Sequence, residues 1–201
     1  LARADAKGAL LQVGHLEWFN AAMRTVAKRV RRPRFFEGHR MGPFPARATD
    51  VDVVRDLMIH DIDIVQRLVG AEPERVDAIG VPVLTDKVDI ANARLTFPGG
   101  AVANLTASRV SPTPLRKLRF FQANGYFSID FLEQAVVIAQ REAAAGGGEP
   151  KITIARVPID RGGALAGQLQ AFLRGIRPRR VEAGDAAQGL PALCTPLRVT
   201  A

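Results

Sequence analysis

Residues 87–110 read KVDIANARLTFPGGAVANLTASRV and alternate apolar with polar side chains on both sides of a PGG turn. An alternation with period two predicts strands, and the turn between them predicts a β-hairpin. The apolar face of the first strand carries Ala91, Ala93, Leu95 and Phe97. The opposite face is polar. We expect it either to face solvent or to be the contact surface of an oligomer.

Further strands are predicted outside the hairpin. They cover residues 9–15, 34–41, 75–83, 115–123, 125–131, 135–140 and 151–157. The stretch 42–50 is proline-rich and predicts a loop, and 141–150 is rich in alanine and glycine and is expected to be mobile.

Helical spacing of apolar residues appears in three segments, 16–30, 51–69 and 164–176. Asn20 is the predicted N-cap in the first segment, and Gly70 ends the second. A further helix in the C-terminal stretch is opposed by its two prolines. The order of elements predicts an α+β fold, with a mostly antiparallel open β-sheet and helices packed on one face.

The chain has 201 residues and a formal net charge of +8, which raises nucleic acid as a partner. Its 23 arginines and 5 lysines are scattered, apart from clusters at 28–34 and 177–180. No zinc-finger spacing, RNP-like motif or helix-turn-helix pair accompanies them. We therefore favour solvated basic faces and keep a basic nucleic-acid-binding domain as the last alternative.

The sequence signals of several other classes of protein are missing. There is no apolar stretch of about 18 residues for a membrane span and no signal peptide. The one cysteine, Cys194, fits a reducing compartment, and we expect a cytoplasmic protein. No histidine or carboxylate trio has metal-ligand spacing, and no G-x-G-x-x-G nucleotide motif is present. The chain starts at Leu1 as if within a helix, so we expect it to begin inside a longer protein.

The helix predicted at 51–69 carries a polar stripe on an otherwise apolar surface. At 100° per residue, the stripe holds Asp52, Asp56, His60, Asp63 and Arg67. Because so apolar a helix is buried, the stripe needs either internal partners or a cavity.

Two interpretations of this stripe remain open. Asp56 and His60 are four residues apart, so the carboxylate can favour the charged imidazole and suit it to general-base work. Alternatively, ion pairs such as Asp63 with Arg67 satisfy the stripe without any function. His15 and the histidine at 39 are expected to be structural or surface residues.

The segment DLMIHDIDIVQRLVG (56–70) resembles the Gfo/Idh/MocA oxidoreductases, as do VGHLEWFN (13–20) and GPFPARATDVDVV (42–54). The resemblance implies the family's C-terminal domain, with a ferredoxin-like or dihydrodipicolinate-reductase-like sheet. It also implies an N-terminal Rossmann domain that binds NAD or NADP. Residues 1–12 would be a remnant of that domain, and 13–201 would be the substrate-binding and oligomerisation domain.

The resemblance also implies roles for the stripe. His60 would take the hydroxyl proton as hydride leaves for the nicotinamide. Asp56 would orient His60 or hydrogen-bond the substrate, and Asp63 would support them. The family's E-K-P lysine, which acts with this pair, is absent from the sequence.

Within the family, VGHLEWFN and the stretch 44–64 look most like the branch that oxidises UDP-N-acetylhexosamines at a ring hydroxyl. Arg47 and Arg40 would flank the cleft mouth, where a cation can meet a diphosphate or carboxylate. Solvated loop arginines are the alternative. Asn20 in the VGHLEWFN segment is a further substrate-binding candidate, although Trp18 stands nearby where the family commonly has arginine.

Two functions precede the nucleic-acid alternative. The first is the substrate-binding and oligomerisation part of an NAD(P)-dependent sugar or nucleotide-sugar dehydrogenase. The second is a non-catalytic binding or scaffold module of the same fold. For the first we expect a homo-oligomer formed through the open sheet face, with no membrane partner and no metal.

Overall fold

The computed structural model describes residues 2–44, 50–142, 151–159 and 162–176, together with 192, 194–196, 198 and 199. Its strands form one eight-stranded sheet in the order β2-β3-β4-β1-β5-β6-β7-β8. Every neighbouring pair is antiparallel except β1 and β4, which are parallel. The strands are β1 (Phe35–Met41), β2 (Arg75–Val81), β3 (Ile90–Thr96), β4 (Val102–Ser108), β5 (Leu115–Gln122), β6 (Gly125–Asp130), β7 (Ala135–Glu142) and β8 (Lys151–Val157).

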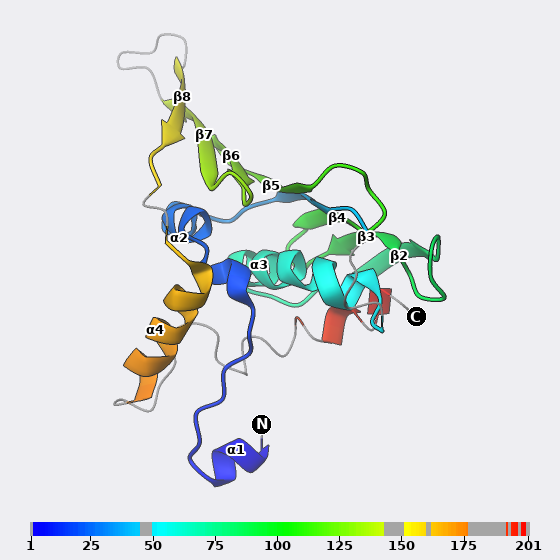
Figure 1. Cartoon of the computed structure of the whole chain (residues 1–201). Helices are drawn as coiled ribbons and strands as arrows, with labels where there is room; N and C mark the ends of the chain where they lie inside the picture. Colours follow the sequence, from blue (N-terminus) through cyan, green and yellow to red (C-terminus); the bar gives the residue numbers. More distant parts are fainter. Residues whose placement is uncertain are drawn as a thin grey trace.

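The helices that pack on the sheet lie on one of its sides (Figure 1). The helical elements are α1 (Ala2–Ala6), η1 (Leu16–Phe19), α2 (Ala21–Ala27), η2 (Val54–Met58), α3 (Ile59–Val69) and α4 (Ala164–Ile176). α3 crosses β1 and β4, α2 lies under β6 and β7, and α4 packs against η1. This arrangement confirms the predicted α+β fold with a mostly antiparallel open sheet.

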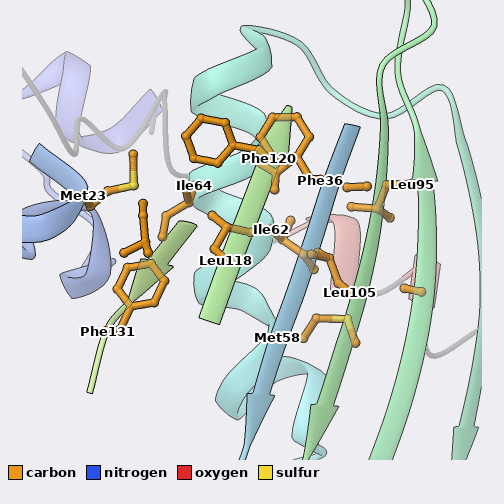
Figure 2. Close-up of a cluster of buried hydrophobic side chains, with 14 of the residues drawn as sticks. Met23, Phe36, Met58, Ile62, Ile64, Leu95, Leu105, Leu118, Phe120 and Phe131 are labelled. Atoms are coloured by element: carbon orange, nitrogen blue, oxygen red, sulfur yellow. The ribbon is translucent and has the colours of Figure 1, made fainter. Parts of the chain in front are cut away.

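The core fills the space between α3 and the sheet (Figure 2). Fully buried side chains there include Phe36, Met58, Ile62, Leu95, Leu105, Leu118 and Phe120. The hairpin alternates as predicted, because its apolar face is buried while Asn92 and Arg94 are exposed on the other face. Burial of apolar area on this scale is the main stabilising term of the fold.

Two glycines allow α3 to lie where it does. A Cβ at Gly38 of β1 would come 2.7 Å from Leu105 of the neighbouring strand, so the missing side chain leaves room for Leu105 in the core beneath α3. At the other end, Gly70 adopts φ +78° and its N–H donates to the carbonyl of Gln66, which ends the helix.

Two predicted elements differ from the structure, and three lie largely outside the residues that it describes. Residues 9–15 join no strand of the sheet; the carbonyl of Val13 instead accepts a hydrogen bond from Gln168 on α4. The helix predicted at 16–30 divides at Asn20, whose Oδ1 accepts the N–H of Ala22, so that residue is the predicted N-cap of the shorter α2. The predicted loop at 42–50, the expected mobile stretch and the C-terminal stretch lie largely outside the described residues.

The helix predicted at 51–69 is real but irregular at its start. Residues 54–58 form a π turn, in which the N–H of Ile59 reaches the carbonyl of Val54. Asp52 precedes this turn, and its Oδ1 accepts the N–H of Arg55 at 2.9 Å. The uniform spacing assumed for the polar stripe is therefore wrong for Asp52, which caps the helix instead.

A buried ion pair ties the start of this helix to the sheet. Arg109 donates from Nε to Asp89 at 2.7 Å and from Nη1 to the carbonyl of Val51 at 2.8 Å. Burial alone would raise the pKa of Asp89. The backbone N–H groups of residues 83–85, together with Arg109, outweigh burial and hold this pKa well below its usual range.

Replacing Asp89→Asn should destabilise the full-length protein by about 3–5 kcal/mol, because the Arg109 charge is left buried without its partner. The matched control is Asp77→Asn, whose pair with Arg75 is exposed; it should cost about 0–1 kcal/mol. Urea denaturation measures both. The difference in stability loss between the two variants should begin to shrink below about pH 4. A carboxyl whose pKa is lowered by folding stabilises in full above its unfolded-state pKa, and this contribution is lost as the pH falls toward the folded-state pKa. Equal effects of the two substitutions would contradict a stabilising role for the buried pair.

Candidate functional site

A cavity of about 560 Å³ opens beside the start of α3 and the ends of β1 and β5. Its described lining is Leu16, Glu17, Arg40, Met41, Gly42, Pro43, Asp56, Leu57, His60, Arg109, Pro114, Arg116 and Leu132. This volume lies within the range of small-molecule sites, and the wall mixes apolar side chains with a few converging polar ones. The cavity is therefore the candidate functional site.

Asp56 and His60 both line this cavity, as the sequence motif led us to expect. Asp56 belongs to the π turn η2, and His60 lies in the first turn of α3. A π turn inside a helix changes the direction of the side chains before it relative to those after it, and such turns are frequent at functional sites. Local helix geometry thus brings the two residues of the motif to one cavity wall.

His60 is held in its neutral form by its surroundings. Burial and, to a smaller extent, the charge of Arg40 lower its pKa to about 4, against opposing contributions from Glu17 and Asp61. This is the reverse of the charged imidazole that the sequence predicted, because desolvation outweighs the nearby carboxylates. The Nδ1 atom of His60 is buried and makes no hydrogen bond with the residues that the structure describes.

His15 and Asp63 lie behind His60. The rings of His15 and His60 meet edge to face with centroids 6.5 Å apart, and Nδ1 of His15 is 3.5 Å from Asp63. Asp63 also accepts two 2.9 Å hydrogen bonds from Nε of Arg67, which confirms that predicted ion pair. His15 is buried, as expected of a structural histidine, and burial lowers its pKa.

Arg40 lies in β1 and lines the cavity, so the alternative of a solvated loop arginine is wrong for it, while its role in substrate binding remains a prediction. Its side chain is 2% exposed and holds Asp61 through two hydrogen bonds of 2.8 and 3.2 Å. A third, of 2.7 Å, reaches Glu17, and the guanidinium lies 5.4 Å from the ring centre of Phe131. The two carboxylates outweigh burial and raise the pKa of Arg40, so the group stays charged beside His60.

The two other substrate-binding candidates are placed differently. Asn20 does not line the cavity within the described residues, and its side-chain oxygen is engaged as the N-cap of α2. Arg47 lies outside the described residues. Both remain predictions as substrate-binding residues.

Sequence reasoning missed three charged residues of the wall, Glu17, Arg109 and Arg116. Glu17 lies inside the VGHLEWFN segment, so the family resemblance of that segment could have indicated it. Arg109 follows β4, and its partner is 20 residues away, so nothing local indicates the pair. Arg116 shares the parity of the buried Leu118 on β5, a pattern that places it on the helix-facing side of the sheet.

The described residues hold neither a metal cluster nor a membrane span. No three histidine, cysteine or carboxylate side chains among them gather as a metal site needs. None of the described helices is long and apolar enough to cross a bilayer.

His60 is expected to titrate near pH 4 in the full-length protein, against about 6.5 when it is unfolded in urea. An NMR titration of the imidazole carbons measures both midpoints, and His60→Gln assigns the signal. Because folding lowers this pKa, the unfolded state binds the proton first, and stability should fall as the pH drops from about 6.5 to 4. That loss should be smaller in His60→Gln. A folded-state midpoint at or above 6.5 would contradict the desolvated site.

Comparisons with known proteins find relatives that are similar to this chain in sequence and in fold. The chain is 38% identical over 197 residues to the UDP-N-acetylglucosamine 3-dehydrogenase of Acidithiobacillus ferrooxidans, covering 98% of this chain and 63% of that protein. The solved structure of that enzyme superposes with a TM-score of 0.91 at 37% identity, covering 99% of this chain and 64% of its own. The aldose-aldose oxidoreductase of Caulobacter crescentus, 21% identical, shares the fold with a TM-score of 0.74 over 98% of this chain and 63% of its own.

The chain thus spans a little under two thirds of the length of these relatives. The family model for the GFO/IDH/MocA C-terminal domain matches residues 21–128, a stretch that contains β1, the π turn and α3. Because this match takes in more than half of the chain, including both residues of the D-x-x-x-H motif, the chain belongs to the Gfo/Idh/MocA family through its C-terminal domain.

Proposed function

We propose that this chain supplies the substrate-binding and proton-accepting side of an NAD(P)-dependent dehydrogenase that acts on a nucleotide sugar of the UDP-N-acetylhexosamine class. The observation that carries the proposal is a neutral His60 in the wall of a ligand-sized cavity, next to Asp56 of the same helix. The 38% identity to a UDP-N-acetylglucosamine 3-dehydrogenase supports the substrate class.

The proposed chemistry is removal of a proton from a sugar hydroxyl as the carbon that bears it is oxidised. A neutral imidazole can accept a proton at pH 7, whereas a charged one cannot, so the lowered pKa of His60 keeps the acceptor available. The imidazole of His60, which lines the cavity, would receive the proton. Asp56 would orient the hydroxyl or the imidazole, and Asp63 would act through His15 behind them.

The nicotinamide cofactor does not fit this chain by itself. The sequence has no G-x-G-x-x-G loop that opens a helix, which is the usual pyrophosphate site. Gly42 is the one glycine among the described residues that line the cavity. We therefore assign residues 13–201 to the substrate and place NAD or NADP on a separate Rossmann domain.

Replacing His60→Ala in the full-length protein should lower kcat by about 10²- to 10⁴-fold, the usual contribution of a general base. Reduction of NAD or NADP with UDP-N-acetylglucosamine or its uronate, followed by absorbance, measures it. Free sugars and inositols serve as alternative substrates.

The matched control is His39→Ala, which removes a histidine from the opposite face of β1 and should leave turnover unchanged. Unchanged turnover in His60→Ala would refute the assignment of the base. Absence of turnover from a protein that binds nicotinamide would favour the non-catalytic binding module.

We also propose that the open face of the sheet forms a homo-oligomer contact. This face carries polar cross-strand pairs, with hydrogen bonds from Asn92 to Thr106 and from Arg94 to Asn104. The edge strands add exposed apolar side chains, because Ile79 is 66% and Ile154 is 71% exposed. Exposed apolar groups rimmed by polar ones are typical of protein contact surfaces.

Asn104→Arg should shift the protein to a smaller assembly, because it places two like charges side by side with Arg94 in the proposed contact. Light scattering after size-exclusion chromatography gives the mass. Ala123→Arg adds the same charge at the β5–β6 turn and should leave the mass unchanged. An unaltered mass in Asn104→Arg would remove this face as the contact.

A further inference from the structure

Two arginines stand directly opposite each other in the sheet beside the cavity. Arg40 of β1 pairs in register with Arg116 of β5, and both line the cavity. On β5 the residues of even number, such as Leu118 and Phe120, are buried under the helices. Because side chains alternate along a strand, Arg116 lies on this same side and not on the open face.

The two arginines differ in how their charges are balanced. Arg40 is buried and bound to Asp61 and Glu17. Arg109, the third arginine of the wall, is bound to Asp89. The Arg116 side chain is exposed and forms no ion pair or hydrogen bond with any residue that the structure describes.

The positive charge of Arg116, without a carboxylate partner among the described residues, favours the binding of an anion in the cavity. Like charges directly opposite each other on a sheet are unfavourable, and the carboxylates that offset Arg40 are already engaged by it. A guanidinium binds phosphate through two parallel hydrogen bonds, which adds both energy and orientation. A ligand that fills this cavity could contact both His60 and Arg116, because both residues line it.

We propose that Arg116 binds the diphosphate of the nucleotide-sugar substrate and so determines its orientation and class. This inference rests on the proposed function. The sugar hydroxyl would lie at His60 and the diphosphate at Arg116, since both residues line the same cavity and Arg116 stands across from Arg40, whose charge acts on His60. Arg116 is thus a specificity-determining residue that favours substrates with an anionic carrier over free sugars.

The test is a binding measurement, independent of turnover. Isothermal titration of the full-length protein with UDP-N-acetylglucosamine, UDP and free N-acetylglucosamine compares three forms: wild type, Arg116→Gln and Arg119→Gln. Arg119 lies on the same strand but on the opposite face, where it pairs with Glu37, so it is the matched control. Arg116→Gln should weaken both UDP ligands by about 10- to 100-fold, as expected for a hydrogen-bonded charge. Arg119→Gln should change nothing.

Partial recovery in Arg116→Lys, which keeps the charge but not the paired hydrogen bonds, would support a phosphate contact. The inference is overturned if Arg116→Gln binds UDP-N-acetylglucosamine as tightly as wild type, or if wild type binds neither UDP ligand. A failure of the proposed function shows separately. In that case UDP binding depends on Arg116, while no oxidation occurs with any substrate.

Discussion

The ion pair between Arg40 and Asp61 is the contact on which the site depends. α3 is buried along most of its length, so each polar group on it needs a partner within the protein. Arg40 projects from the central strand β1 and meets the Asp61 carboxylate with two hydrogen bonds. The position of α3 on the sheet, and with it the position of His60 at the cavity, follows from this pair.

The same pair explains why one titratable group of the site stays neutral. Asp61 is bound to Arg40 and Asp63 to Arg67, so ion pairs within the fold largely neutralise the two carboxylates. Nδ1 of His60 makes no hydrogen bond with any residue in the described part of the chain. Burial and the charge of Arg40 together remove the imidazole's tendency to protonate. Burial and this network of ion pairs thus leave His60 uncharged in the cavity wall at neutral pH.

Much of the fold could be predicted from sequence because it depends on local periodicity. Alternation along the hairpin and the apolar spacing of α3 gave the sheet and its helix face, and four-residue spacing gave Asp63 with Arg67. The π turn and the Arg109–Asp89 pair could not be predicted, since both depend on contacts from distant segments. Arg40 is an instructive case between the two. It shares the parity of the buried Phe36, so the strand pattern indicated a buried arginine, and a buried arginine requires carboxylates.

The irregular start of the helix that carries Asp56 and His60 is stabilised from outside the helix. A π turn has fewer favourable contacts than an α-turn, so it persists only where neighbouring groups hold it. Here Arg109 binds the carbonyl of Val51, and the N–H of Val53 donates to Val88 at 2.9 Å. Both anchors come from the segment around β3 and β4, next to the buried Asp89. The sheet therefore fixes the chain immediately before Asp56, while Arg40 fixes it immediately after His60. The two residues of the motif are positioned by separate contacts on either side, which makes their geometry a property of the whole sheet and not of the helix alone.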